Sequence, residues 1–267
     1  MHDVASTANE TKRRAELRAG FTLIELSIVL VIIGFIVGGV LVGQSLIHSA
    51  ALNKIHTEVE SYRTATNTFL VKYQCLPGDC ANATNFLGTN SLGCAAWPPN
   101  PGWATGTCNG DGNSQINYAP EGYLAWQQLG MAGLIAGNYS GGGTISVIGI
   151  NVPASAYSPA VGYSFNYAYF SGSYSGTGIP GDALSNRLVL GMQSNPWTYG
   201  PFLSVTDIYS MDVKFDDGLP ASGRITVNDI GAGGLCAFLG SATIDPSTHY
   251  NQPSSSILCN VVFTLDQ

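Results

Sequence analysis

The loop after the fourth cysteine carries side-chain oxygens at alternating positions. Asn109, Asp111 and Asn113 alternate with glycines, and Glu121 follows a few residues later. Such a loop can wrap a hard cation, because carboxylate and amide oxygens are the ligands that Ca²⁺ prefers. The match to a calcium loop is partial, since Ser114 stands where a glycine is expected and the last acidic residue comes one place late. A plain Asn/Gly turn held by local side-chain bonds is the competing interpretation.

Asp216 and Asp217 form a second group of chemically useful side chains, within the stretch MDVKFDDGLPASG. Two neighbouring carboxylates could hold a second cation or supply an acid and a base for catalysis. Adjacent acidic residues before a glycine more often form an exposed turn. We therefore expect a turn here, and a hydrolase that uses these two side chains is the least favoured hypothesis.

No catalytic constellation is found elsewhere in the chain. After residue 20 the histidines are His48, His56 and His249, and the sequence contains no HExxH, GxSxG or phosphate-binding glycine loop. We therefore expect that the protein is not an enzyme. Its net charge of -7 also argues against a nucleic-acid partner, which would need clustered Lys and Arg for phosphate contacts.

All six cysteines follow the apolar N-terminal segment, and their even number favours disulfides made in an oxidising compartment. Zinc is the alternative, but no CxxC spacing is present and His249 is the one histidine beyond the first cysteine. Six cysteines allow fifteen pairings. Proximity in the sequence favours Cys75 with Cys80, Cys94 with Cys108, and Cys236 with Cys259.

The segment from Phe21 to Gly43 is apolar except for Glu25. Its 23 residues form a helix long enough to cross the ~30 Å core of a bilayer. A carboxylate in such a helix costs about 2.5 to 3.5 kcal/mol on insertion scales, so it normally needs a partner. Alternatively, Glu25 lies close enough to the end of the segment to reach the headgroup region. The simplest interpretation of the segment is an uncleaved signal anchor, oriented by the Lys and Arg before it.

Small residues precede this apolar segment, whereas a secretory signal peptide places them after it. The stretch Arg18-Ala19-Gly20-Phe21-Thr22-Leu23-Ile24-Glu25-Leu26 resembles the type III signal of type IV prepilins and type II secretion pseudopilins. The resemblance implies that a prepilin peptidase cuts between Gly20 and Phe21 and methylates the new amine. It also implies that Glu25 faces the N-terminal amine of a neighbouring subunit in a filament.

The same resemblance implies a location and partners. The leader would lie in the cytoplasm, the helix in the inner membrane and the head in the periplasm. Implied partners are prepilin peptidase, other pilin or pseudopilin subunits, an inner-membrane assembly platform, and lipid before assembly. The filament would stand in the periplasm or at the cell surface, and the large head favours a minor or tip-associated subunit. Major pseudopilins carry calcium, and many pilins close a C-terminal loop with a disulfide, as Cys236 and Cys259 would. The alternative is a membrane-tethered protein that binds a surface or acts as an adhesin.

The elements that position these residues follow from periodicity. An apolar stripe through Leu52, Ile55, Val59 and Phe69 extends the N-terminal helix toward residue 74. The sequence thus predicts a cleaved leader (1–20), a membrane and assembly helix (21–74) and a globular head (75–267). The resemblance implies an α+β, pilin-like fold, in which the helix packs on a mostly antiparallel β head with long loops.

Within the head, short apolar runs between turn residues predict strands, and one longer run predicts a helix. The helix is expected at Tyr123 to Ile135. Surface loops are expected at Gly141 to Gly143 and Ser171 to Gly178. Strands are expected at Ile145 to Val152, Val161 to Tyr169, Arg187 to Met192, Ser210 to Phe215, Arg224 to Val227 and Ile257 to Leu265.

Overall fold

The computed structural model describes residues 21–94, 105–167, 185–194, 197–227, 230–231, 236–238, 249–251 and 255–265. The predicted leader and the predicted loop from Ser171 to Gly178 lie outside these ranges. The chain divides into two compact units, Met1–His48 and Ser49–Gln267.

Helix α1 (Leu23–Tyr73) contributes to both units. No proline interrupts residues 21 to 74, so the backbone hydrogen bonds of the helix continue over 51 residues. In the first unit its large apolar side chains are exposed, between 48% for Val29 and 90% for Leu23. The helix is long and apolar enough to cross a membrane, with a mean hydropathy of 2.8 over its most apolar window.

In the second unit, the predicted apolar stripe of α1 faces the core of the head. Ile55, Val59 and Phe69 are fully or almost fully buried. Tyr62 makes edge-to-face contacts with Trp126 and Tyr163, at ring-centroid distances of 4.9 and 5.1 Å. Aromatic pairs in this arrangement contribute about 0.5 to 1.5 kcal/mol beyond the area they bury. This part of α1 is therefore built into the head.

Two polar contacts also fasten this part of α1. The Glu58 carboxylate accepts hydrogen bonds from Ser155 Oγ at 2.7 Å, from the Ala156 backbone N–H at 2.8 Å and from Tyr163 Oη at 2.8 Å. Further along the helix, Arg63 donates to the backbone oxygen of Thr264. The Glu58 contacts join the helix to segments 97 to 105 positions away, and the Arg63 contact joins it to a segment 201 positions away.

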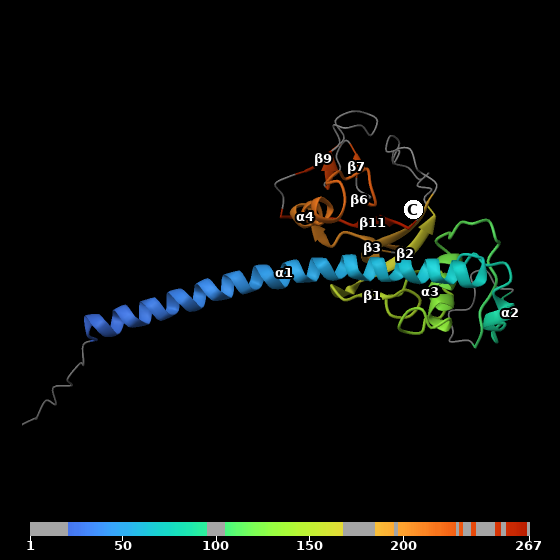
Figure 1. Ribbon diagram of the computed structural model, residues 1–267, viewed down its shortest axis with the longest axis horizontal. Coiled ribbons are helices and arrows are strands. Elements are labelled where there is room, and N and C mark those ends of the chain that lie inside the picture. Colours follow the sequence, from blue (N-terminus) through green and yellow to red (C-terminus); the bar gives the residue numbers. More distant parts are fainter. Residues whose placement is uncertain are drawn as a thin grey trace, which may run out of the picture. The chain divides into compact units, whose positions relative to one another are not determined.

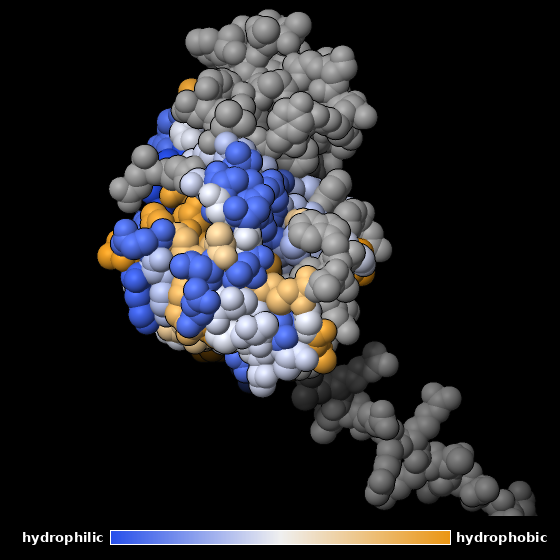
Figure 2. Space-filling model, turned by 90° about the vertical axis from the view of Figure 1, so that its right-hand side faces the viewer, coloured by the Kyte–Doolittle hydropathy of each residue, from blue (hydrophilic) through white to orange (hydrophobic). Residues whose placement is uncertain are grey.

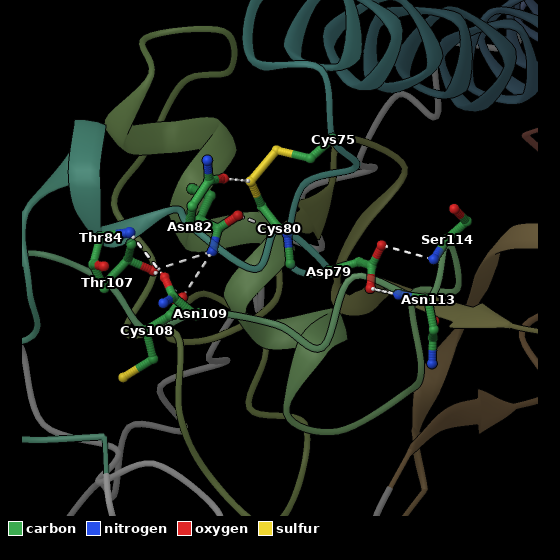
Figure 3. The surroundings of a disulfide bond; sticks show 12 residues. Cys75, Asp79, Cys80, Asn82, Thr84, Thr107, Cys108, Asn109, Asn113 and Ser114 are labelled. Atoms are coloured by element: carbon green, nitrogen blue, oxygen red, sulfur yellow. Dashed lines mark hydrogen bonds between the residues drawn. A yellow bond between two sulfur atoms is a disulfide. The ribbon is translucent and has the colours of Figure 1, made fainter.

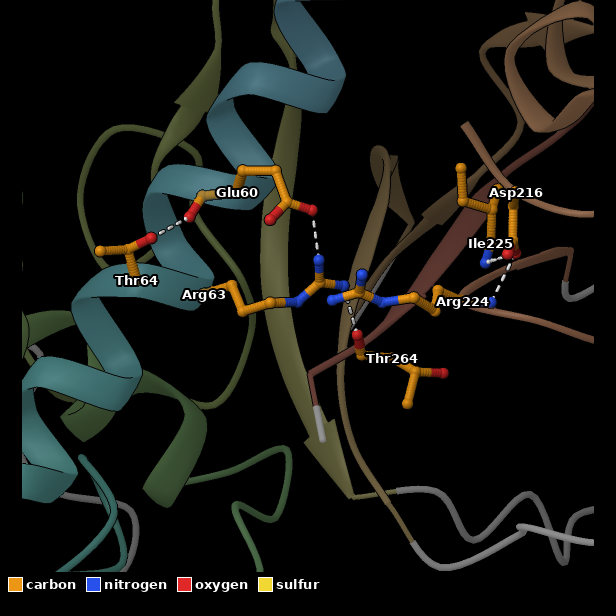
Figure 4. A network of polar contacts seen from close by, with 7 residues as sticks. All are labelled: Glu60, Arg63, Thr64, Asp216, Arg224, Ile225 and Thr264. Atoms are coloured by element: carbon orange, nitrogen blue, oxygen red, sulfur yellow. Dashed lines mark hydrogen bonds and ion pairs between the residues drawn. The ribbon is translucent and has the colours of Figure 1, made fainter. Parts of the chain in front are cut away.

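Arg63 connects α1 to the last strand of the sheet (Figure 4). Its guanidinium pairs with Glu60 and donates to the backbone oxygen of Thr264 at 2.6 Å. Burial lowers the pKa of Arg63; the Glu60 carboxylate opposes this shift, and the like charge of Arg224 adds to it. Arg63 is only 5% exposed, so it acts as a structural cation.

The main sheet has the order β1-β2-β3-β11-β6, and β4 also pairs with β3. All of these pairings are antiparallel. The registers place Tyr163 opposite Leu190 and Val262 opposite Val189. The strands are β1 (Ala154–Ser155), β2 (Ser158–Tyr167), β3 (Asn186–Ser194), β4 (Trp197–Gly200), β6 (Ile225–Val227) and β11 (Val261–Thr264).

Shorter elements surround this sheet (Figure 1). A two-stranded sheet pairs β5 with β10, and a three-stranded sheet has the order β7-β8-β9. The strands are β5 (Leu203–Ser204), β7 (Ile230–Gly231), β8 (Ala237–Phe238), β9 (His249–Tyr250) and β10 (Ile257–Cys259). The helices are α2 (Thr84–Leu87), α3 (Glu121–Met131) and α4 (Val205–Phe215).

The core lies between α1, α3 and the main sheet. Trp126 of α3 is fully buried and packs against Phe165 of β2, with the ring centroids 4.4 Å apart and the ring planes tilted by 41°. In the view of Figure 2, hydrophilic and hydrophobic residues are mixed over the coloured part of the head. This surface contrasts with the exposed apolar helix of the first unit.

Several predicted elements are confirmed. The α+β class, the long helix and the antiparallel head are present, and β2, β3 and β6 lie where strands are predicted. The predicted helix at Tyr123 to Ile135 is α3, which begins two residues earlier and ends at Met131. Residues 168 and 169 of the predicted strand from Val161 lie outside the described ranges.

Three predictions are wrong, and one is confirmed only in part. The strand predicted from Ile257 to Leu265 is present, but as two strands, β10 and β11, with different partners. Ser210 to Phe215 belongs to helix α4 and not to a strand. Ile145 to Val152 forms turns, because the Asn151 side chain bonds the Val147 backbone N–H and the Ile145 oxygen. The segment from Gly141 to Gly143 is buried, since the Asn151 side chain also donates to the Gly142 oxygen.

Candidate functional site

Three disulfides close loops of the head, in the pairs that sequence proximity favours. They join Cys75 to Cys80, Cys94 to Cys108, and Cys236 to Cys259, with Cα–Cα distances of 5.2, 5.6 and 5.3 Å. The first closes the turn directly after α1, and the second ends at the predicted cation loop. These bridges fix where that loop begins.

The Asp79 side chain holds the part of the predicted cation loop at Asn113 and Ser114 (Figure 3). Its carboxylate accepts hydrogen bonds from the backbone N–H groups of Asn113 and Ser114, both at 2.9 Å. Asp79 is only 3% exposed, and it lies inside the short loop that the disulfide between Cys75 and Cys80 closes. Sequence reasoning did not select Asp79, because more than thirty positions separate it from the residues it binds.

Glu121, at the start of α3, holds the other end of this loop. Its Oε2 accepts hydrogen bonds from the backbone N–H of Asn117 at 2.9 Å and from the Asn117 side chain at 3.0 Å. Its Oε1 accepts a longer bond of 3.4 Å from the Asp111 backbone N–H. The acidic side chain also suits the positive end of the α3 dipole.

The structure brings two of the four predicted calcium ligands together. Oxygens of Asp79, Asp111 and Glu121 lie within 4.8 Å of one another. Asn109 instead accepts a hydrogen bond from the Thr84 backbone N–H, and Asn113 Oδ1 accepts one from Gln115. A cation held here would therefore have Asp79 as a ligand in place of these two amides.

The electrostatics of this carboxylate cluster are unfavourable when every member is charged. Burial raises the pKa of Asp79; the Ser114 backbone N–H opposes that shift, and the Asp111 side chain adds to it. Burial also raises the pKa of Glu121, and the charge of Asp111 contributes in the same direction. Three carboxylates at this spacing can share protons or hold a hard divalent cation.

The second acidic pair lies in a turn, as expected, and a buried third carboxylate joins it. Asp216 accepts hydrogen bonds from the backbone N–H groups of Arg224 and Ile225, and Asp217 accepts from Leu219 and Ser222. Oxygens of Asp212, Asp216 and Asp217 lie within 4.8 Å of one another. The acids are thus occupied in holding residues 218 to 225.

At the N-terminal end of the described chain, Thr22 and Glu25 form a capping box. Glu25 Oε2 accepts hydrogen bonds from the Thr22 backbone N–H at 2.9 Å and from Thr22 Oγ1 at 2.7 Å. In return the Glu25 backbone N–H donates to Thr22 Oγ1 at 3.3 Å. This reciprocal pattern satisfies helix N–H groups that have no partner within the helix. Phe21 beside it is 81% exposed, and Gly20 lies outside the described residues.

The same segment decides the comparison with known families. Residues 17–41 match the model of the prokaryotic N-terminal methylation motif. The chain carries a prepilin-type signal. This signal overlaps the exposed apolar part of α1, which is the helix of the described chain that is long and apolar enough to cross a membrane. Together the two findings indicate a pilin-like precursor with a membrane anchor. Comparisons with curated proteins and with solved structures gave no match.

Proposed function

We propose that the protein is a structural subunit of a type IV pilus or of a type II secretion pseudopilus. Prepilin peptidase would cut between Gly20 and Phe21 and methylate the new amine. The mature chain would then enter a filament as a minor or tip-associated subunit. The observation that carries this proposal is the methylation motif at residues 17–41, joined to the exposed apolar helix that begins at Leu23.

The capping box supports a role for Glu25 in assembly. Thr22 holds one oxygen of the carboxylate, whereas Oε1 accepts no hydrogen bond from the described residues. That oxygen is available to the amine of a neighbouring subunit's Phe21. In an apolar surrounding, a charge pair of this kind favours one register, because a misaligned subunit would leave a carboxylate without a partner.

The remaining features are consistent with this location. The head carries three disulfides, which favour an oxidising compartment such as the periplasm. Residues 1 to 20 contain Lys12, Arg13, Arg14 and Arg18, which favour the cytoplasmic side of the membrane. The partners would be prepilin peptidase, lipid before assembly, an inner-membrane platform, and other subunits.

The first experiment is intact-mass and N-terminal analysis of the protein from native membranes and from the sheared surface fraction. We expect a chain that begins with N-methylated Phe21, and an unprocessed chain in cells without the peptidase. An unprocessed N-terminus in peptidase-positive cells would overturn the proposal.

A second experiment separates a filament subunit from a membrane-tethered binding protein. Glu25→Gln should remove the protein from filaments and leave the folded, processed head in the membrane. Normal incorporation of this variant would argue against the assembly role. If the variant retained its cellular activity without filaments, a tethered adhesin would be the better account.

A further inference from the structure

Asp212 joins three separate segments of the head. It lies on the buried face of α4 and is 0% exposed. Its Oδ1 accepts a hydrogen bond from the Gly218 backbone N–H at 3.2 Å, and its Oδ2 accepts one from Tyr250 Oη at 2.6 Å. Gly218 belongs to the turn after α4, and Tyr250 belongs to β9. One carboxyl group therefore holds the helix, the turn and the strand together.

The groups around Asp212 are acidic or neutral. Asp216 and Asp217 approach it from the turn, with oxygens within 4.8 Å. From β9 comes Tyr250, which is 4% exposed and packs edge-on against Tyr209 of α4. The nearby Arg224 contacts Asp216 through its backbone N–H. Within the described chain, no Lys or Arg forms an ion pair with Asp212.

Such surroundings favour the neutral acid. Burial raises the pKa of Asp212 to about 7; the bonds from Tyr250 and Gly218 oppose the shift, and the charges of Asp216 and Asp217 add to it. When the Asp212 carboxyl ionises, its buried negative charge lies close to the negative charges of Asp216 and Asp217, and no Lys or Arg of the described chain pairs with it. When it binds a proton, the same contacts carry no such penalty.

We propose that Asp212 is a proton-controlled latch, closed when protonated, which ties α4 to the turn at residues 216 to 225 and to β9. Ionisation weakens the latch and increases transient opening of both segments. The proposal concerns the head alone and does not depend on filament assembly.

The direction of the pH dependence follows from proton binding. The closed state holds its proton up to about pH 7, whereas an opened, solvated aspartate releases it near its usual pKa of about 4. Opening therefore takes place with proton release and becomes more frequent as pH rises across this interval. The increase can approach tenfold per pH unit and levels off above about pH 7.

The connected segments provide a readout. Asp216 fixes the start of β6 through the Ile225 backbone N–H, at 2.7 Å. Beside Tyr250, the Asn251 backbone N–H donates to the oxygen of Cys236. Hydrogen exchange in peptides that cover residues 216–227 and 249–251 therefore reports on the latch, and exchange in α3 serves as an internal reference.

The experiment measures this exchange by mass spectrometry on the full chain in detergent, from about pH 4 to about pH 8. Wild type and Asp212→Asn are compared at each pH, because the chemical exchange rate then cancels. We expect the opening of the wild-type segments to rise with pH and that of the variant to stay constant. Equal pH dependence in the two proteins would overturn the proposal.

Two further variants keep the test decisive if Asp212→Asn does not fold. Asp217→Asn removes one neighbouring charge, so the rise should level off at a lower pH; an unchanged profile would contradict the latch. Asp207→Asn, on the first turn of the same helix, should behave as wild type.

Discussion

Thr22 and Glu25 form a reciprocal hydrogen-bonded pair at the start of α1, where we propose that Glu25 also takes part in assembly. The capping box satisfies the first turn of α1 and fixes the Glu25 carboxylate at the start of the apolar segment. Thr22→Val should weaken this turn by about 0.5 to 2 kcal/mol and reduce incorporation into filaments, by less than Glu25→Gln. The measurement is the amount of processed subunit in the sheared fraction. Thr22→Ser keeps the hydroxyl and should assemble normally, so equal loss in both Thr22 variants would contradict the cap.

The cluster of Asp79, Asp111 and Glu121 leads to a second prediction at this scale. Calcium should raise the melting temperature relative to EDTA, because a cation offsets the repulsion among three carboxylates. Asp111→Asn should reduce that increase, since Asp111 is the exposed member of the cluster. Asp207→Asn, which lies outside the cluster, is the control. Identical melting in calcium and in EDTA would show that residues 109 to 115 form a plain turn.

Among the elements, α1 was the most predictable and α4 the least. The stripe through Leu52, Ile55 and Val59 has the helical period, and the structure buries these residues. In α4, alternation of Met211, Val213 and Phe215 imitates a strand. The available signal was Ser204, which caps the helix by accepting a hydrogen bond from the Asp207 backbone N–H.

The candidate sites were predictable only where their residues are close in sequence. Asp111 and Glu121 could be selected from one loop, whereas Asp79 joins them across the fold. Tyr250 and Asp212 are separated by 38 positions, and no local pattern links them. The Asn151 contacts that replace a predicted strand depend equally on a specific fold. Periodicity records which face is buried, but not which distant polar groups meet there.

The attachment of α1 to β1 can be tested at the scale of elements. Glu58→Gln places an amide donor where three donors converge, so it should lower the free energy of unfolding by about 1 to 3 kcal/mol. Urea unfolding of the full chain in detergent measures the change. Thr57→Ala, on the adjacent exposed position, should be close to neutral. A neutral Glu58→Gln would mean that apolar packing alone holds the helix.

At the scale of the whole molecule, buried acidic side chains make the folded state more stable at acidic than at neutral pH. Burial raises the pKa of Asp79, Glu121 and Asp212, so the folded state binds more protons than the unfolded state. Their contribution is fully present below the usual pKa of about 4 and is lost as pH rises through the raised pKa of each acid, which for Asp212 is about 7. Burial lowers the pKa of His56, which has the opposite effect below about pH 6.5.

The three acids outnumber the histidine, so the urea midpoint should be higher at about pH 5 than at about pH 7.5. Asp212→Asn should reduce this difference. A midpoint that rises with pH would show that the buried acids do not dominate the titration.

Because basic residues are scarce, trypsin has few positions at which it can cleave the folded protein. After residue 20 there are six possible cleavage positions. Arg63 and Arg187 are buried, Lys54 and Lys72 lie within α1, and Lys214 lies within α4. Arg224 is exposed and lies outside the helices and strands, in the turn that Asp216 holds.

Limited proteolysis of the mature chain should therefore begin after Arg224, at a rate set by how often that turn opens. The rate at which the first fragment appears would thus report how often the Asp212 latch opens. After correction for the pH dependence of trypsin activity, this rate should be lower in acid.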